Sequence, residues 1–214
     1  MKKFVFLVCA LALATASCGG SQPAANTSAG SSPAKPAASN STASASPKTE
    51  KKAPSTNPVP ADWIRMYDDV KGYEFKVPQG TDHKSQTVDG VDVYLASVPA
   101  PYELSVAVVA FKDKNIDKDE LLKRAQNILA SLGDKDVKVD AAKELNDDYS
   151  LANYTAVDDK GKPQKGKILV ATDVTDNYIV LIEGDSDKFS SNEKTIDEIW
   201  GSFGMYSGGF SGNS

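Results

Sequence analysis

The spacing of hydrophobic residues changes twice along this chain. Residues 4–14 are one apolar run, residues 19–60 contain a single branched apolar side chain, and from Trp63 onward apolar and polar positions alternate in two periods. A period of two indicates β-strands, and a period near 3.6 indicates amphipathic helices. The pattern therefore predicts a leader, a spacer and one folded body.

Short extended segments dominate the predicted body. Residues 73–77 alternate strictly between apolar and polar. Residues 86–88 and 91–96 flank the pair Asp89-Gly90, which favours a two-residue hairpin turn. The continuous apolar run at 103–111 is typical of a central strand, and further strands are expected at 137–145, 149–157, 167–171 and 178–183.

Two segments have helical spacing. The first is predicted to begin at Asp117, paired with Glu120 as a capping box, and to end at Gly133. The second is predicted to begin at Ser190, with Glu193 completing an S-x-x-E pattern. The apolar stripes that these helices should bury are Leu121, Leu122, Ala125, Ile128, Leu129 and Leu132, and then Ile196, Ile199, Trp200 and Phe203.

The order of these elements predicts the fold class. Strands joined by short turns are mostly antiparallel, and two amphipathic helices need a sheet face to cover. We expect one α+β domain at residues 61–206.

Before this domain, 35 of the 42 residues at 19–60 are Ala, Ser, Thr, Pro, Gly or Asn, so residues 18–60 are predicted to be a disordered tether behind Cys18. The glycine- and serine-rich tail at 207–214 is expected to be flexible.

The first apolar run has the features of a secretory signal. Two lysines precede residues 4–14, which are too short to span a membrane that requires about twenty apolar residues. Small residues then precede Cys18 in a pattern that resembles the lipobox of bacterial lipoproteins, with Thr15 where leucine is usual. The resemblance implies that residues 1–17 are a signal peptide and that Cys18 carries a diacylglyceryl group, with palmitate as a typical acyl chain.

A second cleavage site leaves the processing open. Residues 14–16 read Ala-Thr-Ala, which suits ordinary signal peptidase and would leave Ser17 at the N-terminus. That cut would expose the Cys18 thiol, and residues 61–214 contain no cysteine to pair with it. An unpaired thiol is a liability in an oxidising compartment, which favours lipidation. Because Gly19 rather than aspartate follows, the lipoprotein sorting rule implies the outer membrane if the source is Gram-negative.

The charge of the chain and the positions of its cysteines exclude several classes of partner and site. The whole chain has a formal net charge of −5, but residues 61–214 alone carry −10. An acidic body of this kind repels nucleic-acid phosphates, so we exclude nucleic acid as a partner. With no cysteine in these residues, a disulfide framework, a thiol nucleophile and a cysteine-ligated metal site are excluded as well.

Short sequence motifs near both ends of the body resemble those of one protein family. Residues 72–80, Gly-Tyr-Glu-Phe-Lys-Val-Pro-Gln-Gly, resemble the opening motif of the PsbP-like domains, with Thr81 where tryptophan often stands. Residues 167–170 and 178–184 resemble the last two strands of that family, and residues 189–203 resemble its final helix with a closing Ser-Phe. The resemblance implies an α/β/α sandwich with a central, mainly antiparallel sheet flanked by two main helices. It also implies a binding or assembly role, since known members of the family have such roles. No catalytic residue carries over, because the matching residues are core and turn positions.

Candidate catalytic residues are few. His83 is the only histidine, and it follows a Pro-Gln-Gly-Thr-Asp turn, so we interpret it as an exposed loop residue. Together with Asp82 it supplies only two neighbouring metal ligands, too few to define a site. No G-x-S-x-G elbow, Walker motif or dinucleotide glycine motif is present in the sequence. We therefore predict no catalytic residue, no metal site and no cofactor.

Two charged clusters have structural interpretations. The carboxylates at 113–120 do not match a calcium loop, because Lys118 stands where the glycine belongs, and they suit the start of a helix. The lysines at 160–167 could grip an anionic partner, but we interpret them as a hairpin tip whose charge keeps sheet edges from pairing.

These observations favour one function over two others. We expect an envelope lipoprotein, held to the membrane by the lipid on Cys18, that acts as a non-catalytic binding or assembly module for an unidentified envelope protein. The alternatives are an exported hydrolase with an unrecognised site, and a carrier of a small molecule or metal that uses the acidic loops.

Overall fold

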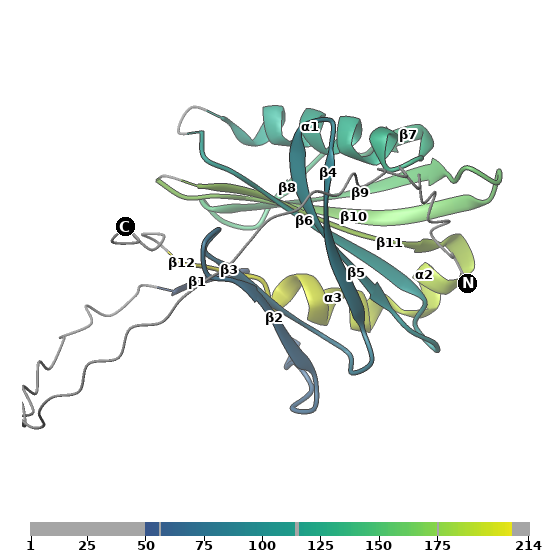
Figure 1. Cartoon of the computed structure of the whole chain (residues 1–214), viewed down its shortest axis with the longest axis horizontal. Helices are drawn as coiled ribbons and strands as arrows, with labels where there is room; N and C mark the ends of the chain where they lie inside the picture. The colour runs from purple at the N-terminus through teal and green to yellow at the C-terminus, as the bar shows by residue number, and fades with distance from the viewer. Residues whose placement is uncertain (1–49, 56, 114–115, 175, 207–214) are drawn as a thin grey trace, which may run out of the picture. The chain divides into compact units, whose positions relative to one another are not determined.

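The computed structural model describes residues 50–55, 57–113, 116–174 and 176–206 (Figure 1). The predicted signal peptide, Cys18, the spacer up to residue 49 and the tail at 207–214 lie outside the described residues. Within the described part of the chain, none of the helices is long and apolar enough to cross a membrane. Over the described residues the body consists of two antiparallel sheets and three helices, which agrees with the predicted α+β class.

The larger sheet has eight strands and forms the centre of the body. Its three longest strands are adjacent, and the one at Asn177–Asp185 is buried along nearly its whole length, as a strand covered on both faces should be. In spatial order the strands are β4 (Asp82–Val88), β5 (Val91–Val98), β6 (Leu104–Phe111), β11 (Asn177–Asp185), β10 (Pro163–Thr172), β9 (Tyr149–Val157) and β7 (Lys135–Val139), and β8 (Lys143–Glu144) also pairs with β9.

Several predicted strands are confirmed. The hairpin of β4 and β5 turns at Asp89 and Gly90, whose φ angles are 49° and 78°, as a two-residue turn of the primed type requires. Strand β9 has the predicted bounds, and β6 lies inside the sheet between β5 and β11. The single strand predicted at 137–145 is wrong, because β7 and β8 are separate there.

A smaller sheet of four strands packs beside the larger one. Its strands, in spatial order, are β1 (Glu50–Lys52), β12 (Gly204–Tyr206), β3 (Tyr73–Val77) and β2 (Ile64–Asp68). No pattern in the sequence indicates that the first and last described segments pair with each other. Both strands have only three residues, which is too short for a period of two to be recognised.

The two faces of the larger sheet bury different clusters. Along β11, Ile179 belongs to a cluster under α1 (Lys118–Ser131), whereas the next residue, Val180, belongs to a cluster under the smaller sheet. That second cluster also contains Phe189 of α2 (Ser186–Ser191) and Ile196 of α3 (Glu193–Gly201). Figure 1 shows α1 and α3 on opposite sides of the β10–β11 layer.

The helices differ in part from the prediction. Asp117 caps α1 as expected, accepting a hydrogen bond from the amide of Glu120 at 2.8 Å. The predicted second helix is wrong in its start: Ser190 lies within α2, where its hydroxyl donates to the carbonyl of Ser186, and Asn192 separates α2 from α3. The S-x-x-E pattern misled because a serine inside a helix can bond back to the preceding turn. The body thus has three helices and a second sheet rather than two helices on one sheet.

The body begins earlier than predicted. Strand β1 and the buried Ala53 lie inside the segment assigned to the tether, so the boundary at residue 61 is too late. The amide of Ala53 donates to the carbonyl of Phe203 at 2.9 Å, and β1 pairs with β12. Backbone pairing of this kind needs no large apolar side chains, which is why the composition of the segment hid it.

Candidate functional site

One end of the body collects most of its connecting segments, and we call it the loop end. Strands β6, β9, β10 and β11 all place one terminus there, since Phe111 pairs with Asn177 and Ala171 pairs with both Tyr178 and Tyr149. The segments that form it are the turns at 69–72, 89–90 and 145–148 and the described parts of the connections at 112–117 and 173–176.

Both ends of the described chain also meet at the loop end. Glu50 at the start of β1 is paired with Tyr206 at the end of β12. The amide of Tyr206 in turn donates to the carbonyl of Gly72 in the β2–β3 turn at 2.9 Å. Segments that precede Glu50 and follow Tyr206 are therefore joined to the body at the same place.

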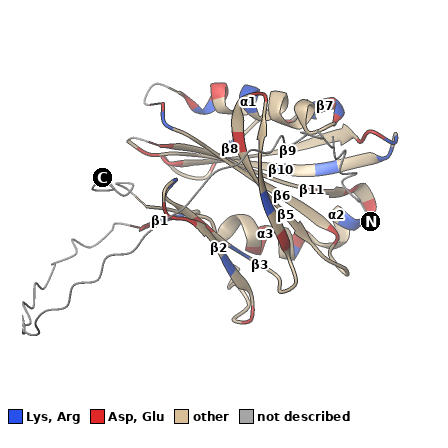
Figure 2. Cartoon of the chain, viewed as in Figure 1, with Lys and Arg blue, Asp and Glu red and all other residues tan. Residues whose placement is uncertain are grey.

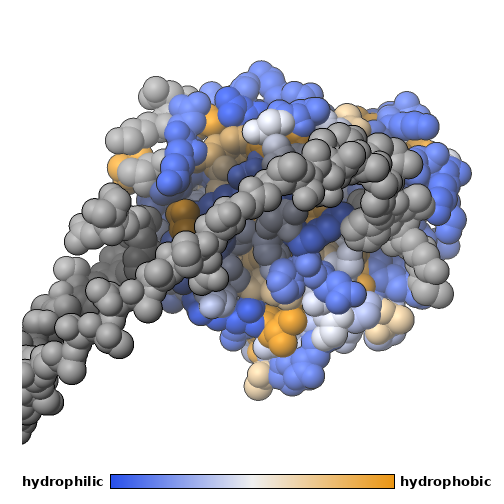
Figure 3. Space-filling view, viewed as in Figure 1, coloured by the Kyte–Doolittle hydropathy of each residue, from blue (hydrophilic) through white to orange (hydrophobic). Residues whose placement is uncertain are grey.

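The most exposed large apolar side chains of the described residues lie at this end. Val174 in the β10–β11 turn is 80% exposed, Val70 in the β2–β3 turn is 72% exposed, and Tyr67 at the end of β2 is 52% exposed. The guanidinium carbon of Arg65 lies 4.6 Å from the centre of the Tyr67 ring. Most of the face in Figure 3 is hydrophilic, with small separate apolar areas. The loop end thus offers exposed apolar contact points from two separate turns.

Carboxylates surround these contact points. Figure 2 shows acidic residues in the turns of the loop end. They are Asp68, Asp69, Asp89, Asp92, Asp113, Asp147, Asp148, Asp173 and Asp176. Four of them have basic partners within the body: Asp92, Asp113, Asp148 and Asp173. An excess of aspartate favours a partner with basic side chains and repels anionic lipid.

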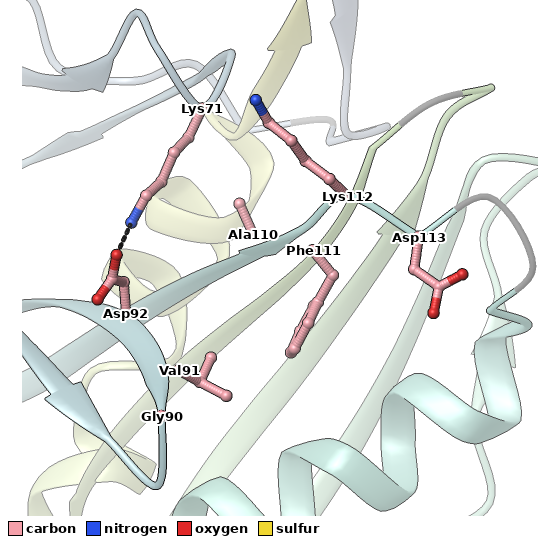
Figure 4. Close-up of a pocket in the computed structure, with 8 residues that line it drawn as sticks. All are labelled: Lys71, Gly90, Val91, Asp92, Ala110, Phe111, Lys112 and Asp113. Carbon is pink, nitrogen blue, oxygen red and sulfur yellow. Dashed lines mark ion pairs between the residues drawn. The ribbon is translucent and has the colours of Figure 1, made fainter.

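A hollow of about 390 Å³ lies between two of these turns and the end of β6 (Figure 4). On one side Lys71 extends toward Asp92, with 3.8 Å between the ammonium and the carboxylate. Phe111 lines the hollow, and the guanidinium carbon of Arg124 lies 5.2 Å from the centre of its ring. Lys112 and Asp113, which follow Phe111 in the chain, also line the hollow. The lining therefore contains charges of both signs and an aromatic ring.

Lys51 holds β1 against the loop end. Its ammonium lies 3.0 Å from a carboxylate oxygen of Asp173 and 3.1 Å from one of Asp148. The Tyr149 hydroxyl donates to the carbonyl of Lys51 at 2.8 Å. The hydrogen bond to Asp173, opposed by partial burial and reinforced by Asp148, raises the pKa of Lys51. This arrangement, the Lys51 clamp, links the first described strand to two turns of the larger sheet.

A second charged group lies on the outer face of the smaller sheet. Arg65 forms an ion pair with Glu74, and its guanidinium also donates to the Tyr206 hydroxyl at 3.3 Å. Burial favours a higher pKa for Glu74, but hydrogen bonds from Tyr206 and Arg65, with the charges of Arg65 and Lys52, outweigh it and lower the pKa. Burial and the Glu74 carboxylate raise the pKa of Tyr206. The carboxylate is therefore held ionised, and the group joins β2, β3 and β12.

The structure places His83 in a strand, so the predicted loop position is wrong. His83 lies in β4 and is exposed, and its ring stacks on Tyr94 with centroids 5.6 Å apart and an interplanar angle of 21°. Adjacent strand residues point to opposite faces, so Asp82 and His83 cannot converge on one metal ion. Among the described residues, no three His, Cys, Asp or Glu side chains are grouped as a metal site.

The other charged clusters are used within the fold. Arg124 contacts Glu120 at 3.3 Å and Asp113 at 4.0 Å, which ties these acidic side chains to α1. The basic cluster at 160–167 begins in the β9–β10 turn and continues into β10, as the hairpin interpretation expects. Three of its lysines have acidic or hydroxyl partners: Lys162 with Asp185, Lys165 with Ser190 and Lys167 with Asp197.

Comparison with solved structures, rather than with sequences, identifies a similar fold. No family model matches the sequence, and no curated protein matches it. Among solved structures, cyanobacterial PsbP (CyanoP) from Synechocystis sp. PCC 6803 is similar, with a TM-score of 0.55 and 18% identity over 68% of this chain and 94% of that chain. The chain has a PsbP-like fold.

Two other solved structures show weaker likeness. One is a protein from Bacteroides thetaiotaomicron VPI-5482, with a TM-score of 0.43 and 8% identity over 64% of this chain and 47% of that chain. The other is LpqN of Mycobacterium tuberculosis, described as involved in cell envelope biogenesis, with a TM-score of 0.36 and 13% identity over 75% of this chain and 86% of that chain.

Sequence reasoning missed the loop end as a site. Lys51 lay in the segment assigned to the tether, and the two aspartates that it contacts are 97 and 122 residues away. No local pattern marks such a contact. The only available signal was the lysine-rich run at 50–52 at the end of a spacer poor in charge.

Proposed function

We propose that this chain is an exported lipoprotein of the cell envelope, anchored by a diacylglyceryl group on Cys18, whose body binds an envelope protein without catalysis. In this proposal residues 1–17 are removed, and the segment up to residue 49 is a tether. The membrane is the outer one if the source is Gram-negative, as Gly19 implies. The PsbP-like body has the arrangement of an α/β/α sandwich, which the separate clusters under α1 and α3 support.

The observation that carries the proposal is the position of the Lys51 clamp. A tether that joins the body at Glu50 leaves it beside Val70 and Val174. Tyr206, the partner of Glu50, bonds to Gly72 two residues from Val70, and Lys51 contacts Asp173, the neighbour of Val174. An anchor at the far end of the tether then keeps the loop end within reach of the membrane. The partner is a protein with basic side chains around apolar contact points, complementary to the acidic turns and exposed valines of the loop end.

Lipidation is tested by metabolic labelling with palmitate in cells that produce Cys18→Ser or Cys9→Ser. We expect Cys18→Ser to lose the label and to leave the membrane fraction, whereas Cys9→Ser keeps both. Mass spectrometry of the mature N-terminus gives the same answer independently. A mature chain that begins at Ser17 with a free thiol contradicts the lipoprotein proposal.

Binding is tested by placing a photoreactive amino acid at single positions in the full chain in intact cells. Val174 and Val70 are the test positions, and Lys160, exposed in the turn at the other end of β10, is the matched control. We expect a discrete cross-linked product from both valine positions that is absent from the Lys160 position. Equal patterns at all three positions contradict binding at the loop end.

A further inference from the structure

Strand β4 is an edge of the larger sheet, and three of its seven residues direct their backbone groups outward. Val88 and Val91 flank the two-residue turn, so they form the first hydrogen-bonded pair of the hairpin. Hydrogen-bonded and non-hydrogen-bonded pairs alternate along an antiparallel ladder. The backbone N–H and C=O groups of Thr87, Ser85 and His83 therefore face away from β5, and the described residues pair β4 with β5 alone.

Among the sheet edges of the described residues, β4 offers the longest strand in an unbroken register. At the opposite edge of the same sheet, the pairing of β7 shifts register between Lys135 and Lys138, where Asp136 has a φ of 51°. Such a bulge twists an edge away from further strands. The edges of the smaller sheet are β1 with three residues and β2 with five. Strand β4 has seven residues in one regular register and contains no proline.

We propose that two copies of this chain pair through β4, antiparallel and with the two-fold axis at Ser85. In that register Ser85 faces Ser85 of the second copy, and His83 faces Thr87 of the second copy on both sides of the axis. The outward backbone groups of His83, Ser85 and Thr87 in one copy then hydrogen-bond to those of the same three residues in the second copy. The larger sheets of the two copies form one continuous sheet.

The side chains agree with this register. On one face His83 lies opposite a threonine, and on the other face Lys84 lies opposite Gln86 of the second copy, so no like charges are directly opposed. Moving the axis by one residue to Lys84 puts two lysines directly opposite each other and leaves Thr87 beyond the end of the facing strand. Moving it to Gln86 leaves His83 beyond the end in the same way. The register at Ser85 uses the most backbone groups.

Disulfide trapping tests the register. The full chain with Cys9→Ser and Cys18→Ser has no thiol, so each introduced cysteine acts alone. The Cα atoms of a hydrogen-bonded antiparallel pair are about 5.5 Å apart, within the range of a disulfide, so Ser85→Cys should cross-link two copies under mild oxidation. Thr87→Cys is the matched control on the same face, because four residues place its sulfur about 13 Å from its counterpart.

We expect Ser85→Cys to form the disulfide dimer at least tenfold faster than Thr87→Cys. In a second experiment, the double variant His83→Cys/Thr87→Cys should cross-link two copies, because residues 83 and 87 face each other. Adding Ser85→Pro removes the outward backbone N–H of residue 85 and should suppress this cross-link. Circular dichroism checks that each variant is folded. Equal rates for the two single variants, or a double variant whose cross-linking ignores the added proline, overturn the proposal.

Discussion

Tyr154 reaches across a glycine to donate a hydrogen bond to Glu183, with 3.0 Å between the oxygen atoms. Gly166 is the residue in between, paired with Tyr154 of β9 on one side and Glu183 of β11 on the other. The ring occupies the space of a side chain at Gly166. Burial, followed by the nearby Glu183 carboxylate, raises the pKa of Tyr154 well above its usual range, so the hydroxyl stays a donor.

Gly166→Ala should be strongly destabilising. The added methyl group would lie 2.1 Å from two ring carbons of Tyr154, so the ring must leave its site and lose its bond to Glu183. We expect the free energy of unfolding to fall by about 3 kcal/mol, as overpacking and the loss of a buried hydrogen bond each contribute. Urea denaturation measures it, and far-ultraviolet circular dichroism monitors the fold.

A double-mutant cycle isolates the cause. In a Tyr154→Ala background the clash is gone, so Gly166→Ala should cost less than about 1 kcal/mol there. If the cost of the alanine is the same in both backgrounds, the ring is not the reason for the glycine.

Tyr73 and Tyr178 give opposite expectations for the same substitution. Both are 1% exposed and their rings meet edge to face at 6.0 Å, but their hydroxyl groups differ. The Tyr178 hydroxyl donates to the carbonyl of Lys71 at 2.8 Å, whereas the buried Tyr73 hydroxyl has no hydrogen-bond partner among the described residues. Tyr178→Phe should lower the free energy of unfolding by about 1–2 kcal/mol, and Tyr73→Phe should leave it unchanged or raise it by up to about 1 kcal/mol.

Thermal and urea unfolding of the two variants, measured side by side, checks this. Each is the control for the other, because both remove one hydroxyl from the same cluster. A loss of stability in Tyr73→Phe as large as that in Tyr178→Phe would contradict the hydrogen-bond assignment.

The Lys51 clamp should stabilise the body more than its neighbour does. Lys51→Met removes two ion pairs, one to an Asp173 side chain that is only 4% exposed, and should cost about 1–2 kcal/mol. Lys52→Met is the matched control, because its pair with Glu50 is solvent-exposed and should contribute less than about 0.5 kcal/mol. Hydrogen exchange should also speed up in β1 and β12 in the first variant alone. An equal loss of free energy of unfolding in the two variants would show that the contacts of Lys51 do not stabilise the body more than those of Lys52.

The sequence predicted the parts of the fold that local rules control. The hairpin at Asp89-Gly90, the cap at Asp117 and the bounds of β9 depend on residues close in the chain, and all three are confirmed. The second helix failed at Ser190 because its capping pattern competes with bonding inside a helix. Local rules also missed β1, whose place depends on residues at the other end of the body.

The candidate site was harder to predict, for a related reason. Exposure cannot be read from residue type: Val70 and Val174 are typical core residues by composition, yet they lie in turns. His83 was expected in a loop because a turn precedes it, but the turn ends before Asp82 and the strand includes both residues. Cys18 lies outside the described residues, so its lipid remains a prediction from the sequence motif.

Glu74 should make stability depend on pH in the acid range. Its folded pKa is lowered from 4.5, so the ionised carboxylate stabilises the body at neutral pH, and this contribution is lost as the pH falls through the folded pKa. Glu74→Gln should lower the free energy of unfolding at pH 7 by about 1 kcal/mol, a modest amount because Arg65 is half exposed. The difference between the variant and the original chain should shrink when the pH is lowered from 7 to about 3.

Urea denaturation at a series of pH values measures this difference directly. Asp62→Asn, at an exposed position before β2, controls for the removal of one negative charge from the body and should shift stability by less than about 0.5 kcal/mol at pH 7. A difference for Glu74→Gln that stays constant or grows as the pH falls would contradict the lowered pKa. It would also mean that the contacts with Arg65 and Tyr206 do not hold the carboxylate ionised, and that the smaller sheet owes its cohesion to the buried side chains beneath it.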